Sequence, residues 1–598
     1  MSFLKKTVRF NIWQAIFTVA FALMLLMSRH IVRDMNAGTS TLVDVYFSNF
    51  DILDPVLLIV FLAVLYPLTG ILFYLMGYGM KTFFGERRDG KLWVYFVIFG
   101  VIGILWIPYA MTYWPGGVYN DTYNSIQIAL GQEPMTTHEP ILYTLLWKLV
   151  FALSGTLSGA SVYNGLKLFT ILQLYGFDAL LSAVVYSAYK KGIKRVWMFA
   201  LTAIFAIFPL FPFYGISLWK DSIFGMVVFL YSWHLLNMSR RSAKDMRIRD
   251  IVLYAILTVL VIFLRNNGIF VAIFVSVITA IVFLCRDRQA MAEETNRKKL
   301  LGAFSVKLAA TSLAVIVCAL IVRGPVFDAL GYNVDSSIES LGIPLQQTAF
   351  IVSSEGNVSG EDVEALSYLM PMESWRSNYS PINVDTIKFA PEFDRDYFMG
   401  NTGEFMKVYT DLIIHNPVKA MKGYLLTTMG FWDVFEASGS GYICNFHFSL
   451  TGFFMSDYWE VYTGWSWNDL VIPKHPISAA VWVWIMIFCV CAVMSTTCKH
   501  SRKSESDSDD ANADAVESEA GSVEASIVGC EAVTAATKMD GIDSKAMRIL
   551  AIMPSLGVWL TIMLAVPLAF SLRYVFSVFL CVPICLMAMF EVMDNRKV

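Results

Sequence analysis

Apolar stretches of about 18 residues or more, each with few charges, recur along most of this sequence and restrict it to folds that a bilayer accepts. The chain is 57% hydrophobic and 16% charged, which is far less charge than a soluble domain carries. We therefore predict an all-α polytopic membrane protein with about 12 transmembrane helices. We expect these helices at residues 11–27, 55–78, 92–110, 165–189, 196–213, 222–238, 251–264, 269–285, 303–322, 477–497, 549–570 and 574–590.

Basic residues set the expected orientation, because cytoplasmic loops carry an excess of Lys and Arg. The basic cluster at residues 81–91 then lies inside, and so does the cluster at 190–195. The second placement holds only if residues 140–157 lie along the outer surface instead of crossing. We therefore predict two juxtamembrane helices in one outer loop, at 121–131 and 140–157, with both termini in the cytoplasm.

The predicted helices divide the chain into seven parts. The long polar stretch is too long for a bare loop, so we expect it to pack as a small mixed extracytoplasmic domain. A second polar stretch, rich in Ser, Ala, Asp and Glu, is expected to be a disordered acidic linker in the cytoplasm. The parts are helices 1–3 (1–110), the outer loop (111–164), helices 4–9 (165–322), the extracytoplasmic domain (323–476), helix 10 (477–498), the linker (499–548) and a C-terminal hairpin (549–598).

The outer loop opens with a segment that breaks the third helix, Trp114-Pro115-Gly116-Gly117-Val118-Tyr119-Asn120-Asp121. Pro115 cannot continue a helical hydrogen-bond ladder, and two glycines let the backbone turn sharply. Asp121 then falls just outside the hydrocarbon, where a carboxylate stays ionised and can meet a lipid head group. We interpret this loop as the floor of an active site in a membrane enzyme.

Polar residues at the outer ends of several predicted helices fall on one side of the membrane. Charged groups at membrane depth are costly, and they usually face a cavity or a partner of opposite charge. Cations in such a pocket suit a phosphate, and a carboxylate suits proton abstraction from a hydroxyl. Simpler roles stay open: Asp121 as a helix cap, Lys220 with Asp221 as a local pair, and Arg265 and Arg573 as side chains that snorkel to head groups. The candidate residues are Asp121, His138, Glu139, Lys220, Asp221, Arg265, Asn266, Asn267 and Arg573.

Several classes of protein lack support in the sequence. There is no GxxxxGK[ST] loop of an ATP-driven pump, no H-E-x-x-H motif and no Cys/His zinc spacing. The Asp394-Arg395-Asp396 pattern is of a kind that can hold a divalent metal, but such patterns are common by chance, and we assign no metal ligand. No cofactor is indicated, and no nucleic acid partner is expected. Since no Gly-rich nucleotide loop faces the cytoplasm, a donor substrate should be carried by a lipid.

The order of these features resembles the GT-C class of integral-membrane glycosyltransferases, in which an acidic residue lies in an early outer loop with two juxtamembrane helices. The chain looks closer still to a family of Gram-positive, largely actinobacterial, membrane proteins described as glycosyltransferase-like. The segments that carry the resemblance are Trp114-Pro115-Gly116-Gly117, His138-Glu139-Pro140, Trp219-Lys220-Asp221, Arg265-Asn266-Asn267-Gly268, Leu341-Gly342-Ile343-Pro344-Leu345-Gln346-Gln347 and Arg573-Tyr574.

The resemblance implies a polyprenyl-phosphate sugar as donor, an envelope glycan or glycolipid as acceptor, and a site on the outer side of the plasma membrane. Asp121 would be the general base of an inverting reaction, with His138 and Glu139 as further catalytic candidates. The cations would hold the lipid phosphate, and the resemblance leaves room for a divalent metal. Two alternatives share the cationic pocket: a flippase for a lipid-linked glycan, and a ligase or polymerase that uses a lipid-diphosphate oligosaccharide.

Overall fold

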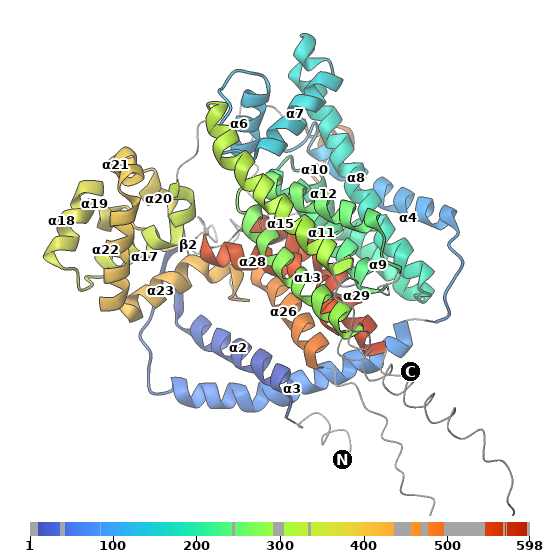
Figure 1. Cartoon of the computed structure of the whole chain (residues 1–598), viewed down its shortest axis with the longest axis horizontal. Helices are drawn as coiled ribbons and strands as arrows, with labels where there is room; N and C mark the ends of the chain where they lie inside the picture. Colours follow the sequence, from blue (N-terminus) through green and yellow to red (C-terminus); the bar gives the residue numbers. More distant parts are fainter. Residues whose placement is uncertain are drawn as a thin grey trace, which may run out of the picture.

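The computed structural model is almost entirely helical (Figure 1), and it describes residues 10–35, 42–83, 85–241, 245–290, 304–332, 337–435, 456–467, 477–495, 545–565, 569 and 571–594. Each of the twelve apolar segments predicted from the sequence contains a helix in its described part. The acidic linker predicted at 499–548 lies outside the described residues as far as residue 544.

Eight helices in the described part of the chain are long and apolar enough to cross a membrane, and a pair bent by 47° makes a ninth if it is one span. The structure is therefore that of a mainly helical polytopic membrane protein, and the count of twelve spans stays a prediction. The eight are α2 (Ile12–Arg29), α3 (Asp54–Phe83), α4 (Leu92–Leu105) with α5 (Ile107–Thr112), α8 (Val162–Lys190), α11 (Lys220–Ser239), α13 (Gly268–Ala290), α15 (Phe304–Ile321) with η3 (Val322–Val326) and α16 (Phe327–Ala329), and α29 (Leu572–Asp594). The bent pair is α9 (Arg195–Ile207) and α10 (Leu210–Ile216).

Three further apolar helices are shorter: α12 (Ile248–Leu264), α26 (Ala479–Ser495) and α28 (Met553–Leu564). Two short helices, α6 (Asn120–Ala129) and α7 (Ile141–Leu153), occupy the loop that we expected to hold juxtamembrane helices. With 10 and 13 residues, they are too short to cross a bilayer. A 3₁₀ turn, η1 (Thr156–Ser158), follows them, and α24 (Tyr458–Thr463) packs against α5.

Helix α29 lies at the centre of the bundle, against α11, α26 and α28 (Figure 1). Its first turns are buried except for Arg573, which is partly exposed, and the ring of Phe576 stacks on that of Tyr214 in α10 at 3.9 Å between centroids. Because the helix begins at Leu572, the side chain of Arg573 is carried to the middle of one end of the bundle.

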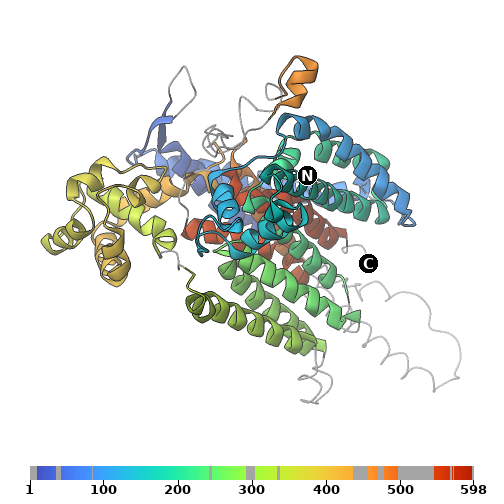
Figure 2. The same ribbon diagram turned by 90° about the horizontal axis from the view of Figure 1, so that it is seen from above.

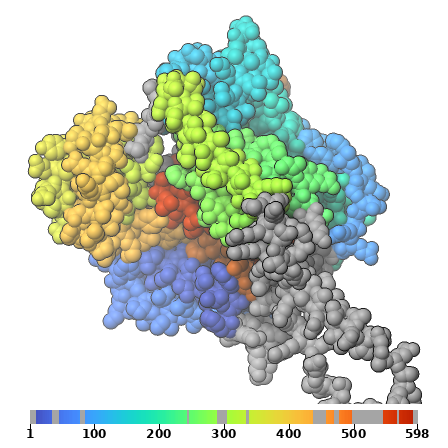
Figure 3. All heavy atoms as spheres, in the orientation of Figure 1, coloured from blue at the N-terminus to red at the C-terminus, as the bar shows by residue number. Residues whose placement is uncertain are grey.

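The polar stretch contains a helical domain, which Figure 2 shows beside the bundle. This domain has its own hydrophobic core. Figure 3 shows it as a lobe at one side of the bundle. We expected mixed secondary structure here, and that prediction is wrong for the described residues 337–435, which contain no strand. The reason is local, since Ser359 and Asp394 cap helices with their side chains and Pro417 begins one. Its elements are η4 (Ser337–Leu341), α17 (Gly342–Ser353), α18 (Gly360–Leu369), α19 (Met372–Ser377), α20 (Asp385–Lys388), α21 (Arg395–Gly400), α22 (Thr402–His415), α23 (Pro417–Thr428) and η5 (Met429–Phe431).

A short antiparallel hairpin, β1 (Ile31–Met35) and β2 (Leu42–Phe47), follows α2 and was not predicted. It lies in a loop that we expected outside, where Arg29 and Arg33 conflict with the charge rule. Both side chains are neutralised, because Arg29 pairs with Asp51 at 2.7 Å and Arg33 pairs with the buried Asp433. The second pair also joins the hairpin to the end of the helical domain.

Candidate active site

The glycine-containing loop positions the site by pairing with the segment before α11. The amide of Gly117 donates to the carbonyl of Ile216 at 3.1 Å, and the amide of Leu218 donates to the carbonyl of Gly117 at 2.8 Å. Gly116 has φ +120°, and a Cβ there would lie 2.2 Å from Oγ1 of Thr170, so the turn requires glycine. The loop therefore holds the first turns of α6 and α11 side by side.

Further contacts fix the two helix starts. The ring of Tyr119 stacks on that of Trp219 at 3.8 Å between centroids. The carbonyl of Leu218 accepts hydrogen bonds from the hydroxyls of Thr122 and Tyr143, the latter at 2.6 Å. The residues that follow Tyr119 and Trp219 are thereby fixed relative to each other, and they include Asp121 and Lys220.

Six charged side chains form a continuous series in which carboxylates and cations alternate, and we call it the ion-pair chain. Its members, in order, are Glu139, Lys220, Asp121, Arg573, Asp221 and Arg265. The Nζ of Lys220 lies 3.0 Å from Oε2 of Glu139 and 3.3 Å from Oδ2 of Asp121. Lys220 thus bridges the carboxylates of the outer loop.

The second half of the ion-pair chain is built on α11, α12 and α29. The Nη2 of Arg573 lies 2.9 Å from Oδ2 of Asp121, and its Nε lies 3.1 Å from Oδ2 of Asp221. The Nη1 of Arg265 is 3.1 Å from Oδ1 of Asp221. Three carboxylates therefore balance three cations, as burial of charge requires.

Burial differs along the ion-pair chain. The side chains of Glu139 and Asp221 are 1% and 2% exposed, whereas that of Asp121 is 27% exposed. Asp121 is thus the most open carboxylate of the three and the one that a ligand can reach most easily.

The two carboxylates of the outer loop have opposite pKa shifts. Burial alone would raise the pKa of Asp121, but the nearby Lys220 and Arg573 outweigh it and hold that pKa well below its usual value. Burial raises the pKa of Glu139, an effect that Lys220 opposes and that Asp121 reinforces. Asp121 is therefore ionised at neutral pH. Glu139 takes up a proton at a higher pH than an ordinary glutamate does.

Aromatic rings surround the two arginines. The guanidinium of Arg573 lies 5.5 Å from the ring centroid of Trp219 and 5.2 Å from that of Tyr574. The guanidinium of Arg265 lies 5.3 Å from the ring of Tyr574 and 5.6 Å from that of Phe224. These contacts favour the cations and restrict their movement. The aromatic residues were not predicted as site residues, although Trp219 and Tyr574 belong to the short segments that carried the resemblance.

The three remaining candidates flank the ion-pair chain. Asn266 donates from Nδ2 to the carbonyls of Thr137 and His138, at 3.0 and 2.9 Å, and so holds the outer loop in place. Asn267 donates to Oγ1 of Thr561 in α28 at 3.1 Å. The His138 side chain is close enough to lower the pKa of Asp121. The structure thus joins six of the nine predicted residues directly and places two asparagines in supporting contacts.

The structure gives no support for a metal site in the residues that it describes. In the described part of the chain, no three His, Cys, Asp or Glu side chains are grouped to hold a metal ion. Asp394, of the D-x-D pattern, caps α21 by accepting from the amide of Tyr397 at 2.8 Å.

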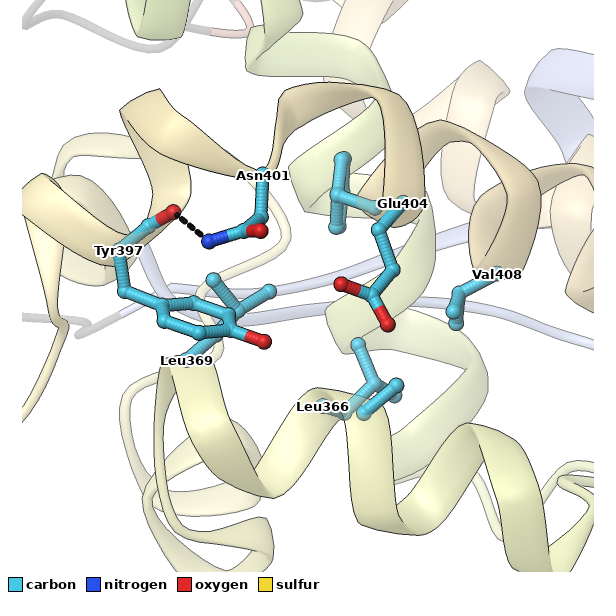
Figure 4. Close-up of a pocket in the computed structure, with 8 residues that line it drawn as sticks. Leu366, Leu369, Tyr397, Asn401, Glu404 and Val408 are labelled. Carbon is cyan, nitrogen blue, oxygen red and sulfur yellow. Dashed lines mark hydrogen bonds between the residues drawn. The ribbon is translucent and has the colours of Figure 1, made fainter.

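A hollow in the helical domain, between α18, α21 and α22, has a volume of about 10 Å³, which is room for about one water molecule. Figure 4 shows Glu404 and Tyr397 pointing into it, with Leu366 below Glu404 and Leu369 beside the ring of Tyr397. Asn401, on its wall, donates to the carbonyl of Tyr397 at 2.9 Å. The hollow is too small for a sugar or an organic cofactor.

A protein-family model described as a family of unknown function, DUF6020, matches residues 131–501, which is more than half of the chain. The chain belongs to the DUF6020 family. The DUF6020 match includes Glu139, Lys220, Asp221 and Arg265, and it leaves Asp121 and Arg573 outside. No curated protein and no solved structure matches the chain.

Proposed function

We propose that this protein is a membrane glycosyltransferase, with a GT-C-like arrangement, that transfers a sugar from a polyprenyl-phosphate donor to an envelope glycan or glycolipid. The observation that carries the proposal is the ion-pair chain, in which the most exposed carboxylate lies between two cations at the ends of apolar helices. A lipid-borne phosphate and a sugar hydroxyl would meet at this depth. In this proposal the site faces outward and both termini are cytoplasmic.

In the proposed reaction, Asp121 accepts the proton of the acceptor hydroxyl as its oxygen attacks the anomeric carbon of the donor. The bond between that carbon and the phosphate oxygen breaks, and the polyprenyl phosphate leaves with the electron pair. Lys220, Arg265 and Arg573 stabilise the charge that builds on the phosphate. Attack from the face opposite the leaving group inverts the anomeric centre.

The ion pairs of Asp121 suggest the order in which the donor binds and the acceptor is activated. Before a ligand arrives, Asp121 is held by both Lys220 and Arg573, which makes it a weak base. A donor phosphate would compete for the same cations and so release the carboxylate. Donor binding would thus precede activation of the acceptor.

The test compares wild type with Asp121→Asn in membranes that receive labelled polyprenyl-phosphate sugars and envelope acceptors. Transfer should fall about 10²-fold or more in the variant, as expected for loss of a general base. Asp411→Asn is the matched control, since Asp411 is 45% exposed and lies in α22 of the helical domain. Equal transfer by Asp121→Asn and wild type would exclude Asp121 as the base. No transfer from any donor, with a polyprenyl lipid still co-purifying, would favour a flippase or a diphosphate-linked donor.

A further inference from the structure

Arg323 is a cation at the rim of the site that takes no part in the ion-pair chain. It lies in η3, directly after α15, and its Nη1 donates to the carbonyl of Asn266 at 2.9 Å. Asn266 is the neighbour of Arg265 and holds the carbonyl of His138. Arg323 is thus connected through one residue both to the end of the ion-pair chain and to the outer loop.

The charge of Arg323 is not balanced by a neighbour. Within the described ranges, no Asp or Glu lies at ion-pair distance from it. Its side chain is half-buried, and a desolvated guanidinium without a countercharge is unfavourable. The ion-pair chain is neutral in itself and so supplies no spare carboxylate to Arg323. An anionic ligand would supply the missing countercharge.

The local backbone is also unusual. Residues Val322–Val326 form a π-helical turn with Pro325 inside it. Such turns are rare and are frequent at functional sites. This turn directly follows α15 and contains Arg323, whose side chain reaches the carbonyl of Asn266.

Helix α15 leads to Arg323 with an apolar face that no described residue covers. Leu313, Val317 and Leu320 are 64%, 44% and 53% exposed, and the stripe ends about one turn before Arg323. A ligand that suits both features has a long hydrocarbon chain and a phosphate at its end.

We propose that Arg323 binds the phosphate of an isoprenoid lipid at the rim of the site, with the lipid chain lying along the exposed face of α15. This inference rests on the proposed function for the kind of lipid. Arg323 is the first contact, from which the phosphate passes inward to the cations of the ion-pair chain.

The test uses the full chain in nanodiscs of phosphatidylcholine, titrated with undecaprenyl phosphate. Arg323→Gln should weaken binding about tenfold or more, as loss of a hydrogen bond to a charged group does. Arg323→Lys should recover part of the affinity, because it keeps the charge. Arg376→Gln is the matched control, since Arg376 is 50% exposed and lies in α19. Unchanged binding by Arg323→Gln would overturn the proposal.

Two further arms identify the ligand and its position. Titration with phosphatidylglycerol should show no dependence on Arg323, whereas an equal loss for both lipids would mark a general head-group contact and overturn the assignment. A photoreactive analogue of undecaprenyl phosphate should crosslink to α15, and crosslinks confined to other helices would overturn the placement of the chain.

The two proposals can fail separately. Sugar transfer by wild type, with lipid binding unchanged in Arg323→Gln, would leave the glycosyltransferase standing and reject Arg323. Weakened lipid binding in Arg323→Gln, without sugar transfer from any donor, would support the role of Arg323 and reject the glycosyltransferase.

Discussion

Replacement of Asp221 by asparagine should destabilise the protein strongly, because it removes the carboxylate between two arginines. The side chain is 2% exposed, and its oxygens lie 3.1 Å from Nε of Arg573 and 3.1 Å from Nη1 of Arg265. Asparagine keeps the shape but leaves the charge of Arg265 without this partner, whereas Arg573 still pairs with Asp121.

Breaking a buried ion pair in this way costs about 3–5 kcal/mol. The partial exposure of Arg265, 12%, and of Arg573, 20%, places the expected loss near the lower end, at about 3 kcal/mol. The double variant Asp221→Asn, Arg265→Gln removes both members of the outer pair. It should therefore be less destabilised than the sum of the single variants, by about 1–3 kcal/mol.

The assay is equilibrium unfolding in detergent micelles by titration with sodium dodecyl sulfate, followed by tryptophan fluorescence. Asp411→Asn, at an exposed position, should change the free energy of unfolding by no more than about 0.5 kcal/mol. If Asp221→Asn unfolds within that margin of wild type, or if the double variant is additive, the ion-pair chain does not stabilise the bundle as argued here.

Two other outcomes follow from the same geometry. Arg573→Gln should raise the pKa of Asp121, because it removes one of the two cations that hold this pKa below its usual value. Because the base acts when ionised, the acid limb of the residual transfer rate should move to higher pH in this variant, and an unmoved limb in a pH–rate profile would contradict the pairing. Gly116→Ala should lower stability by about 1–3 kcal/mol, since φ is +120° and the new Cβ would clash with Thr170. Gly403→Ala, with open space around the Cβ, is the control in thermal unfolding, and equal stability of both variants would contradict the close approach.

Much of the helical architecture could be predicted from apolar length alone, because a membrane leaves a chain few other options. From the sequence we could predict that Asp121, Lys220 and Arg573 lie on the same side of the membrane. The pairing itself could not, since Arg573 and Asp121 are 452 positions apart and no local pattern relates them. The hydrogen bonds that Asn266 and Asn267 make could not be predicted for a similar reason, and their contact with a ligand stays a prediction. An asparagine at a helix end looks the same in sequence whether it binds a ligand or a carbonyl.

The central position of α29 has a consequence for synthesis of the chain. Arg573 leaves the ribosome 308 residues after Arg265, which at usual elongation rates is a delay of about 15–60 seconds. During that interval the nascent protein holds three carboxylates of the site against two cations, and the middle of its bundle is open. The addition of α29 therefore completes the charge balance of the ion-pair chain and the core of the bundle in one step. A chain that stops before α29 would leave Asp121 and Asp221 without Arg573, their shared partner, and a quality-control protease could distinguish an unfinished protein from a finished one by these carboxylates and the open bundle.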